Sequence, residues 1–331
     1  MLQNLIAWVI RAIPFGTIIM YGSMGETVTE KSGHLNLGVP GIMYLGGFAG
    51  FTSAYFYEHN AANPSALVCV LLSLVCAFLA AMLGGLIYAF LTITLRANQN
   101  VTGLALTTFG MGVANFGGVF LLNGASYTAA PLAFSAYSTK IIPGWDKTGV
   151  FGEMFLSYGF LVYVAILLAV AMHFFLNKTR VGLNLRAVGE SPATADAAGI
   201  HVTKYKYLAT CIGAGISGIG GLYYVLDYNR GIWATTGQIE ALGWLAVALV
   251  IFTTWRPLNG IWGAYLFGML YWLYQYLPNL LGITISNYAI DLVQMIPYVV
   301  TIVVLIVVSL RKKRENQPPA SLGIAYYRED R

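Results

Sequence analysis

Charged residues are what this sequence has least of. Only 9% of its 331 residues are Asp, Glu, Lys or Arg, whereas 58% are hydrophobic and the mean hydropathy is +0.69. A soluble domain carries roughly 25% charged residues, so this composition excludes an ordinary water-soluble enzyme. Five runs without any of these charges are each long enough for a membrane-spanning helix of about 20 residues: Val101–Thr139, Met154–Asn177, Tyr207–Leu226, Pro257–Ile290 and Leu292–Leu310. We therefore expect a polytopic membrane protein.

Patterns typical of catalysis and metal binding are also missing. The three cysteines lie inside apolar runs and form no CxxC pair, which favours packed helix cysteines. The sequence contains no HExxH, no hydrolytic constellation and no GxxxxGK[ST] loop. We expect no catalytic residue, no metal, no cofactor and no ATP-binding loop in this chain. The placement of the basic residues along the chain indicates membrane topology rather than a nucleic-acid-binding surface, so no nucleic-acid partner is expected.

One match to a nucleotide-binding motif lies in an unsuitable context. Gly213-Ala-Gly-Ile-Ser-Gly218 fits the GxGxxG fingerprint, which requires a preceding strand and a following amphipathic helix. This copy lies in an uncharged membrane run, with further small residues at a spacing of four. Small residues at that spacing favour close packing of membrane helices, and we interpret the segment in that way.

The hydropathy pattern predicts an all-α helical bundle with about nine transmembrane passes, some of them broken. The third predicted pass covers 31 residues, roughly 46 Å as a helix, so it must tilt, project or break, and Gly84-Gly85 marks a candidate break. We interpret Met1–Met20 as a retained first helix rather than a cleaved signal. The predicted passes are Leu2–Gly22, Asn36–Tyr57, Ser65–Leu95, Val101–Leu122, Phe155–Leu176, Tyr207–Leu226, Ile239–Trp255, Leu258–Leu277 and Tyr288–Leu310.

The basic residues predict the orientation. With the N-terminus outside, 14 of the 18 Lys and Arg residues lie on the cytoplasmic side, as the positive-inside rule requires, and the C-terminus is cytoplasmic. We divide the chain into a transmembrane domain, residues 1–310, and a polar tail, residues 311–331, that is expected to be disordered. A cytoplasmic segment at residues 177–206 is too long for a simple connection between helices.

A short helix is predicted within the cytoplasmic segment. Ser191 followed by Pro192 is a helix start, Ala193–Ala198 favours helix, and Gly199 is suited to end it in a left-handed conformation. Such a helix is well shaped to dock in a groove of another protein. From the residues alone, a surface loop without a partner is an equal alternative.

Glycine and proline interrupt the chain before the second pass. Three glycines and a proline between Gly33 and Gly41 argue against a continuous helix. Irregular backbone at membrane depth is tolerated where protein or a water-filled path satisfies it, and the alternative is a plain loop into the pass. We expect similar interruptions of the fourth pass at Asn100–Gly103 and Gly110–Gly112.

Few ionisable residues fall within the passes, namely Arg11, His173 and Asp291, with Glu240 at a helix edge. Such groups usually face the bundle interior or an aqueous path. Three scattered groups give weak support to an ion-coupled carrier, and an Arg11–Asp291 ion pair is a structural alternative.

Three segments, in family order, resemble permease subunits of bacterial ABC importers in the ribose and branched-chain amino acid permease superfamily. Ser32–Gly41 resembles the "SGxxNLGxxG" segment, Gly189–Ile200 resembles the cytoplasmic "GxNPxAAxxAGI" loop, and Trp255–Gly268 resembles "xxPxGxxxGAxLFG". The form of the first segment is closest to the nucleoside-importing branch that works with basic-membrane-protein-type lipoproteins. Ser191 replaces the usual Asn, and Thr253-Thr254 stands where relatives often carry Gly.

The resemblance implies a permease subunit in a bacterial plasma membrane that imports a nucleoside. Its implied partners are a separate ABC ATPase subunit, a second permease subunit (identical or related), an extracytoplasmic substrate-binding lipoprotein and the lipid bilayer. The implied ATPase-coupling residues are Glu190, Ser191, Pro192, Ala195, Asp196 and Gly199. The residues placed along the translocation path are Asn36, Gly38, Gly41, Asn100 and Thr102.

Other functions fit the same composition. A pentose or a branched-chain amino acid suits a nearly charge-free path almost as well as a nucleoside. An ion-coupled secondary transporter and a membrane scaffold are rivals from other classes.

Overall fold

The computed structural model describes residues 2–121, 128–140, 144, 149–233, 237–281, 292, 293, 295–311 and 317–327. The described helices and π-helical turns are α1 (Leu2–Lys31), α2 (Val39–Asn60), α3 (Ala66–Ala89), η1 (Phe90–Thr94), α4 (Gln99–Leu121), α5 (Pro131–Ser138), α6 (Val150–Phe155), α7 (Phe160–Lys178), α8 (Arg180–Glu190), α9 (Pro192–Ala197), α10 (Val202–Tyr223), η3 (Tyr224–Tyr228), α11 (Gln238–Phe252), α12 (Pro257–Leu281) and α14 (Ile296–Arg311). Two short antiparallel strands, β1 (Thr128–Ala129) and β2 (Ile232–Trp233), pair with each other.

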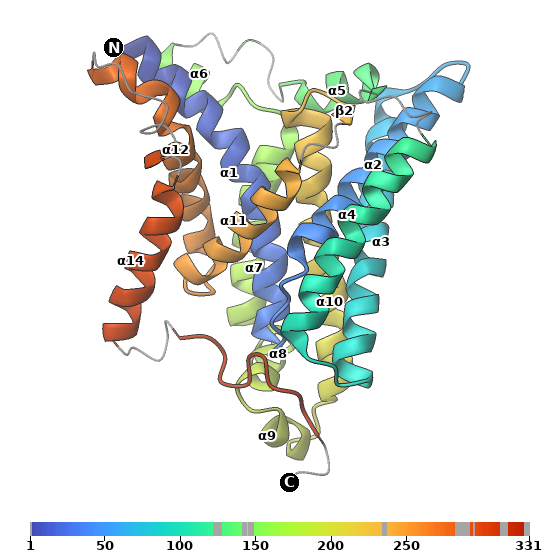
Figure 1. Cartoon of the computed structure of the whole chain (residues 1–331), viewed down its shortest axis with the longest axis vertical. Coiled ribbons are helices and arrows are strands. Elements are labelled where there is room, and N and C mark those ends of the chain that lie inside the picture. Colours follow the sequence, from blue (N-terminus) through green and yellow to red (C-terminus); the bar gives the residue numbers. More distant parts are fainter. Residues whose placement is uncertain are drawn as a thin grey trace.

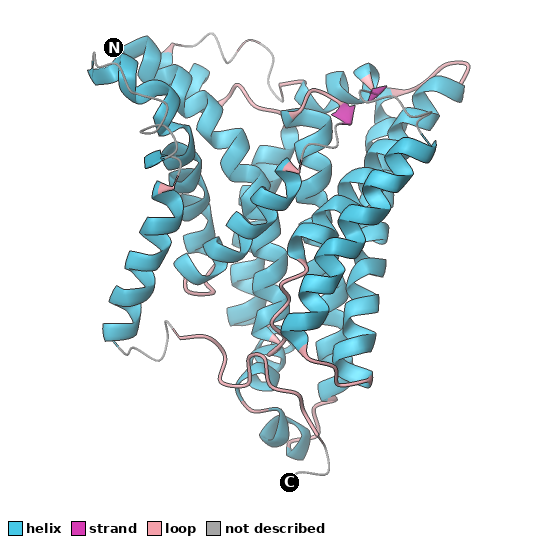
Figure 2. Ribbon diagram, viewed as in Figure 1, coloured by secondary structure: helices cyan, strands magenta, loops and turns pink. Residues whose placement is uncertain are grey.

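The long helices form a bundle with two different ends. Helices α5 and α6 and the paired strands lie at one end, whereas α8 and α9 lie at the other (Figures 1 and 2). Among the described residues, five segments are long and apolar enough to cross a membrane: Gln3–Lys31, Ala66–Thr94, Gln99–Leu121, Phe160–Lys178 and Val202–Tyr228. Helix α11 is apolar but shorter. The chain is therefore a multi-pass helical membrane protein.

Helix α10 lies at the centre of the bundle, packed against α1, α2 and α3. Its glycines make that packing possible, because a Cβ at Gly213 would overlap the carbonyl of Gly25, and one at Gly218 would overlap Ala81. Ser217 donates a hydrogen bond to the Gly22 carbonyl at 3.1 Å. The GxGxxG match therefore lies in a helix–helix contact, as interpreted from the sequence, with backbones in close approach.

Three of the expected interruptions, at Gly84-Gly85, Asn100–Gly103 and Gly110–Gly112, are wrong. Gly84 and Gly85 lie inside continuous α3, which ends only where the π-helical turn η1 begins. Gly85 is needed for close approach instead, because its Cβ would overlap Ala214 of α10. The fourth pass is also unbroken from Gln99 to Leu121, and Gly110 packs directly on the Gly41 carbonyl of α2.

The described part of the tail, residues 317–327, contacts the rest of the chain. Its backbone runs back to the bundle, where the Ser321 amide and hydroxyl both donate to the Gly189 carbonyl at 3.1 and 2.6 Å. The Gly323 amide donates to the Gly33 carbonyl at 3.2 Å. Gly33 itself has φ +88°, and a Cβ there would meet the Ser321 hydroxyl at 2.5 Å. The tail therefore joins the α1–α2 connection to the end of α8.

The close contact between α2 and α10 gives a stability prediction. Gly221→Ala would place a Cβ against the Met43 carbonyl, whereas a Cβ added at Gly112 of α4 would have nothing within 4 Å. We expect Gly221→Ala to lower the free energy of unfolding by about 2 kcal/mol, since overpacking forces the backbones apart. Gly112→Ala is the control and should be neutral or stabilising by up to about 1 kcal/mol. Unfolding of the purified variants in mixed micelles measures both changes in the free energy of unfolding. Equal changes in the two variants would contradict the close packing of α2 against α10.

Candidate functional site

The connection between α1 and α2 is irregular, as predicted, and protein groups satisfy its backbone. The Leu35 amide donates to Gln99 Oε1 at 2.8 Å, and the Tyr88 hydroxyl donates to the Leu35 carbonyl at 2.6 Å. Thr107 Oγ1 donates to the Leu37 carbonyl at 3.0 Å. The connection between α1 and α2 runs beside α4 (Figure 1). These bonds meet the requirement that irregular backbone among apolar helices be paired internally.

Asn36 fixes the start of α2. Its amide donates to Glu26 Oε1 at 2.9 Å, and its side-chain Oδ1 accepts from the Gly38 amide at 2.9 Å. Gly38 and Gly41 let α2 approach α4, because a Cβ at either position would press on Leu106. Asn36, Gly38 and Gly41 are therefore brought together in one contact between α1, α2 and α4.

Asn100 and Thr102 do not join that contact. Asn100 is exposed at the start of α4, and Thr102 Oγ1 donates to the carbonyl of Asn98, the residue just before α4, at 2.8 Å. Their neighbour Gln99 makes the bond to Leu35 instead. Gln99 is buried, whereas Asn100 is exposed, because successive residues in the first turn of a helix point in different directions.

Two buried carboxyl groups connect this segment to the turn between α11 and α12. Glu26 and Glu30 lie one helical turn apart on α1 and are each 1% exposed. Glu30 accepts a hydrogen bond from the Trp255 indole. Thr254 and Trp255 have φ values of 54° and 55°, a conformation that bulky and β-branched residues rarely adopt. Glycine adopts positive φ without this steric cost, so it would be the less strained residue in this turn.

The segment at residues 177–206 contains the predicted short helix. Ser191 caps α9 by accepting from the Thr194 amide at 3.4 Å, with Pro192 in the first turn. At the other end Gly199 has φ +82°, and the Ile200 amide donates to the Ala195 carbonyl at 3.0 Å. The capping chemistry predicted from the sequence is thus the chemistry observed.

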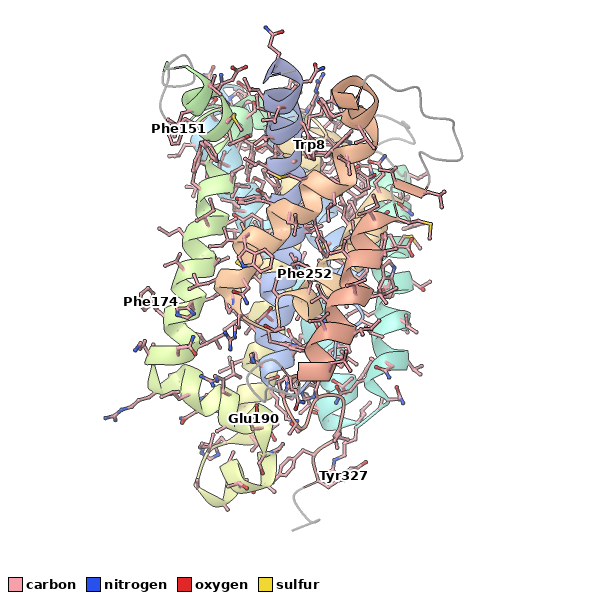
Figure 3. The ribbon with its side chains drawn as sticks, turned by 90° about the vertical axis from the view of Figure 1, so that its left-hand side faces the viewer. Trp8, Phe151, Phe174, Glu190, Phe252 and Tyr327 are labelled. Atoms are coloured by element: carbon pink, nitrogen blue, oxygen red, sulfur yellow. The ribbon has the colours of Figure 1, made fainter. Side chains whose placement is uncertain are left out.

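The predicted coupling residues do not share one surface. Ala195 is buried against Val188 and Val202, beneath the helix. Glu190 and Gly199 are exposed, and Glu190 is seen at the same end of the molecule as Tyr327 (Figure 3). Ala193, Thr194 and Ala197 of α9, and Ala198 just beyond it, are exposed as well. A charge at Ala195 would therefore disrupt the support of α9 rather than its outer surface.

The tail also contacts α9. The Tyr326 hydroxyl donates to Asp196 Oδ2 at 3.0 Å, and the guanidinium of Arg96 lies 4.4 Å from the ring centre of Tyr327. Asp196 is thereby turned toward the tail. A helix of six residues has little stability alone, so these contacts and its buried Ala195 hold it in place.

A cavity of about 470 Å³ lies toward the opposite end of the bundle, among α1, α5, η3 and α12. Aromatic and polar side chains line it, including Tyr158, Tyr223, Tyr228 and Trp272. Asp227 of η3 also lines it, and its buried Oδ2 has no hydrogen-bond partner among the described residues. Cavities of this volume, mostly apolar with a few polar groups, are typical small-molecule sites.

The scattered ionisable groups have separate surroundings. Arg11 lines this cavity, 5.2 Å from the Trp272 ring centre, and its Nη1 lies 3.4 Å from Gln275 Oε1. His173 contacts Asn177 on its own helix at 3.1 Å. Asp291 lies outside the described residues, so the Arg11–Asp291 pair remains a prediction.

The described residues thus form a multi-pass membrane bundle with a capped helix at one end and a polar aromatic cavity toward the other. Residues 9–306 match the model of the branched-chain amino acid transport system / permease component family. The chain belongs to this family of ABC transporter permeases. No solved structure matches the chain.

The relatives carry different names. The chain is 34% identical to a guanosine ABC transporter permease of Bacillus subtilis, over 74% of this chain and 75% of that protein. It is 29% identical to a nucleoside ABC transporter permease of Lactococcus lactis, over 88% of each. It is also 34% identical, over 77% of this chain and 72% of the other, to a Haloferax volcanii protein provisionally named a glucose ABC transporter permease.

Sequence reasoning missed several residues of these sites. Glu26 and Glu30 were overlooked because the first pass was ended at Gly22, whereas α1 continues to Lys31. Their i, i+4 spacing on a helix was the available signal. Asp227 lies one residue beyond the predicted sixth pass, Tyr207–Leu226, and nothing local in the sequence indicates that η3 buries it.

The Gln99 bond gives a test of how the irregular segment is held. Gln99→Leu removes the acceptor for the Leu35 amide, so the free energy of local opening at residues 32–38 should fall by about 1–3 kcal/mol. Hydrogen exchange of that segment measures the change. Asn100→Leu, on the neighbouring exposed position, is the control and should leave exchange unchanged. Equal exchange in the two variants would contradict the role of Gln99.

Proposed function

We propose that this chain is the membrane-spanning permease subunit of an ATP-driven importer that forms the path for a nucleoside. The nucleoside assignment is supported by the similarity of this chain, over most of both chains, to permeases named for guanosine and for nucleosides. A pentose or other sugar is the second candidate, favoured by the similarity to the protein provisionally named for glucose. A branched-chain amino acid is the third.

The cavity that contains Asp227 is the proposed entry site for the substrate. A nucleoside is neutral and has an aromatic base, which Tyr158, Tyr228 or Trp272 would contact through their ring faces. The Asp227 carboxylate would accept hydrogen bonds from ribose hydroxyl groups, and bonds to a charged acceptor are the stronger kind. The proposal assigns binding to this chain's own aromatic rings and one carboxylate.

The proposed energy source is an ABC ATPase subunit that docks on the exposed side of α9. The coupling residues are Glu190, Ser191, Pro192, Ala195, Asp196 and Gly199, with Ser191 and Ala195 supporting the helix and the others lying nearer its surface. Movement of the ATPase would be transmitted through α9 to α10, which follows it in the chain. Asn36, Gly38, Gly41, Asn100 and Thr102 are proposed for the translocation path.

The remaining parts of the importer follow from the same proposal. A binding lipoprotein delivers the substrate to the end that carries α5 and α6, and a second permease subunit, identical or related, completes the path. The chain lies in a bacterial plasma membrane with about nine passes, its N-terminus outside and its tail, residues 311–331, in the cytoplasm. The positive-inside distribution of Lys and Arg supports this orientation.

The substrate proposal predicts a role for Asp227. In proteoliposomes that contain the complete importer, Asp227→Asn should reduce ATP-dependent guanosine uptake by about tenfold to a hundredfold, because a hydrogen bond to a charged group contributes about 1.5–3 kcal/mol. Glu153→Gln, an exposed carboxylate of α6 outside the cavity, is the control. Competition with unlabelled nucleosides, ribose, glucose and leucine identifies the substrate class. Uptake driven by an ion gradient without the ATPase would overturn the importer assignment.

The coupling proposal is tested on the exposed side of α9. Ala193→Glu places an acid near the helix start and Ala197→Arg a base near its end, so both charges suit the helix dipole and the fold should persist. Each should lower ATP-dependent uptake by about tenfold or more, since a charge at a protein interface without a partner costs several kcal/mol. Ala62→Arg, exposed at the opposite end, is the matched control. Normal uptake by well-expressed α9 variants would show that the ATPase docks elsewhere.

A further inference from the structure

Two adjoining cavities at the α9 end are not used by the proposed transport mechanism. The first has a volume of about 820 Å³ and lies between η1, the start of α10 and the tail. The second has a volume of about 680 Å³ and lies between α7, α8 and α10. Both are lined by His201, Lys204 and Leu208. They therefore meet along one ridge of α10.

The first cavity is basic. Arg96, Lys204 and Lys206 line it together with His34 and His201. Lys206 and His34 are each only 2% exposed, and His34 Nδ1 has no hydrogen-bond partner among the described residues. Burial and the nearby Lys206 hold the pKa of His34 well below its usual range, so its ring is neutral at pH 7 and offers a hydrogen bond without adding charge.

The acidic groups do not neutralise this cavity. Asp196 is the single acidic residue among the described residues that line this cavity. Its Oδ2 accepts a hydrogen bond from the Tyr326 hydroxyl. Three lysine and arginine side chains therefore converge on a space with a single carboxylate. Basic pockets of this kind, at the cytoplasmic ends of membrane helices, bind anionic headgroups.

The second cavity is an apolar groove. Met172 and Phe175 of α7 line one side, and Ile212 and Ile216 of α10 line the other. Phe175 and Ile212 are 36% and 44% exposed. A groove with this lining, open to its surroundings, fits a hydrocarbon chain.

The depth of the two cavities matches the layers of a bilayer. Helix α7 ends at Lys178 and α8 begins at Arg180, two basic residues of the kind that mark the cytoplasmic headgroup region. The basic cavity is lined by residues of η1, of the start of α10 and of the tail, and α8 and α9 lie at that end of the bundle (Figure 1). The groove runs from Lys204 along α10 toward the membrane interior, past Ile212 to Ile216.

We propose that the two cavities together bind one anionic phospholipid of the cytoplasmic leaflet. Its phosphate lies in the basic cavity near Arg96, Lys204 and Lys206, and an acyl chain lies in the groove between α7 and α10. The pairing of a basic cavity with an apolar groove favours this amphipathic ligand over a free phosphate, which needs no groove. An acidic loop of a protein partner would likewise leave the groove unexplained.

The position of the site gives the lipid a role in coupling. His201 and Lys204 follow directly after α9, and Arg96 contacts the ring of Tyr327 in the tail. A bound headgroup therefore links α10, η1 and the tail beside the proposed ATPase-docking helix. This role depends on the proposed function, whereas lipid binding itself does not.

Lipid retention by the purified full-length chain tests the site. The protein is reconstituted in vesicles of phosphatidylcholine and phosphatidylglycerol in equal parts, extracted in mild detergent, and analysed by native mass spectrometry. Phosphatidylglycerol should be retained in preference to phosphatidylcholine. The double variant Lys204→Gln/Lys206→Gln should weaken retention about 30-fold, since each basic group near an anionic lipid contributes a factor of about five.

Further variants separate the site from general surface attraction and from misfolding. Lys178→Gln/Arg180→Gln changes two basic residues at the same membrane level outside the basic cavity and should leave retention unchanged. Arg96→Gln, an exposed position, should weaken retention about fivefold without burying a new group. Thermal unfolding of each variant verifies that it is folded.

The groove variant distinguishes the two sources of phosphate. Ile212→Trp fills the groove without changing any charge, so phosphatidylglycerol retention should fall while the basic cavity stays intact. Equal retention of the two lipids, unchanged retention in the lysine double variant, or unchanged retention in Ile212→Trp would overturn the proposal. Displacement of phosphatidylglycerol by millimolar inorganic phosphate would indicate a free-phosphate site and would also overturn it.

Discussion

The close approach of α10 to α1 and α2 is the constraint on which the other features depend. Backbones this close require residues without side chains at the crossing points, and Gly213, Gly218 and Gly221 provide them on α10. Association of membrane helices relies on such packing and on hydrogen bonds, because lipid offers no hydrophobic driving force between helices. The segment Val202–Tyr228, of 27 residues, is thus a rod of about 40 Å held firmly within the bundle.

Several of the features proposed to be functional lie along or beside this rod, whereas the proposed path residues belong to the α1–α2 connection, α2 and α4. The short helix α9 precedes its first turn, the basic cavity and apolar groove share its next residues, and Asp227 lies in its final turn. A movement of α9 would reach α10 through the short connection at residues 198–201, and α10 would carry it toward the far cavity. The glycine contacts that make α10 rigid would also make it an effective link between a motor and a substrate site.

Local chemistry was predictable from the sequence, and tertiary placement was not. Ser191, Pro192 and Gly199 specify α9 because capping depends on residues within a few positions of each other. The burial of Ala195 depends on Val188 and Val202, and no periodicity in a six-residue helix reveals it. Gly84-Gly85 was predicted to break α3 because glycine weakens an isolated helix, whereas here its missing side chain admits the neighbouring helix.

Two π-helical turns among the described residues show what remains hidden from sequence patterns. One turn, η1, ends α3 beside the basic cavity, where Thr92 and Ile93 form part of the lining. The other, η3, ends α10 and carries Asp227 into the far cavity. A π-helical turn adds a residue to the turn and so rotates the side chains beyond it, and such turns are frequent at functional sites. In regular α-helical geometry Asp227 would point in another direction, so the local widening of the helix is what presents a carboxylate to the cavity.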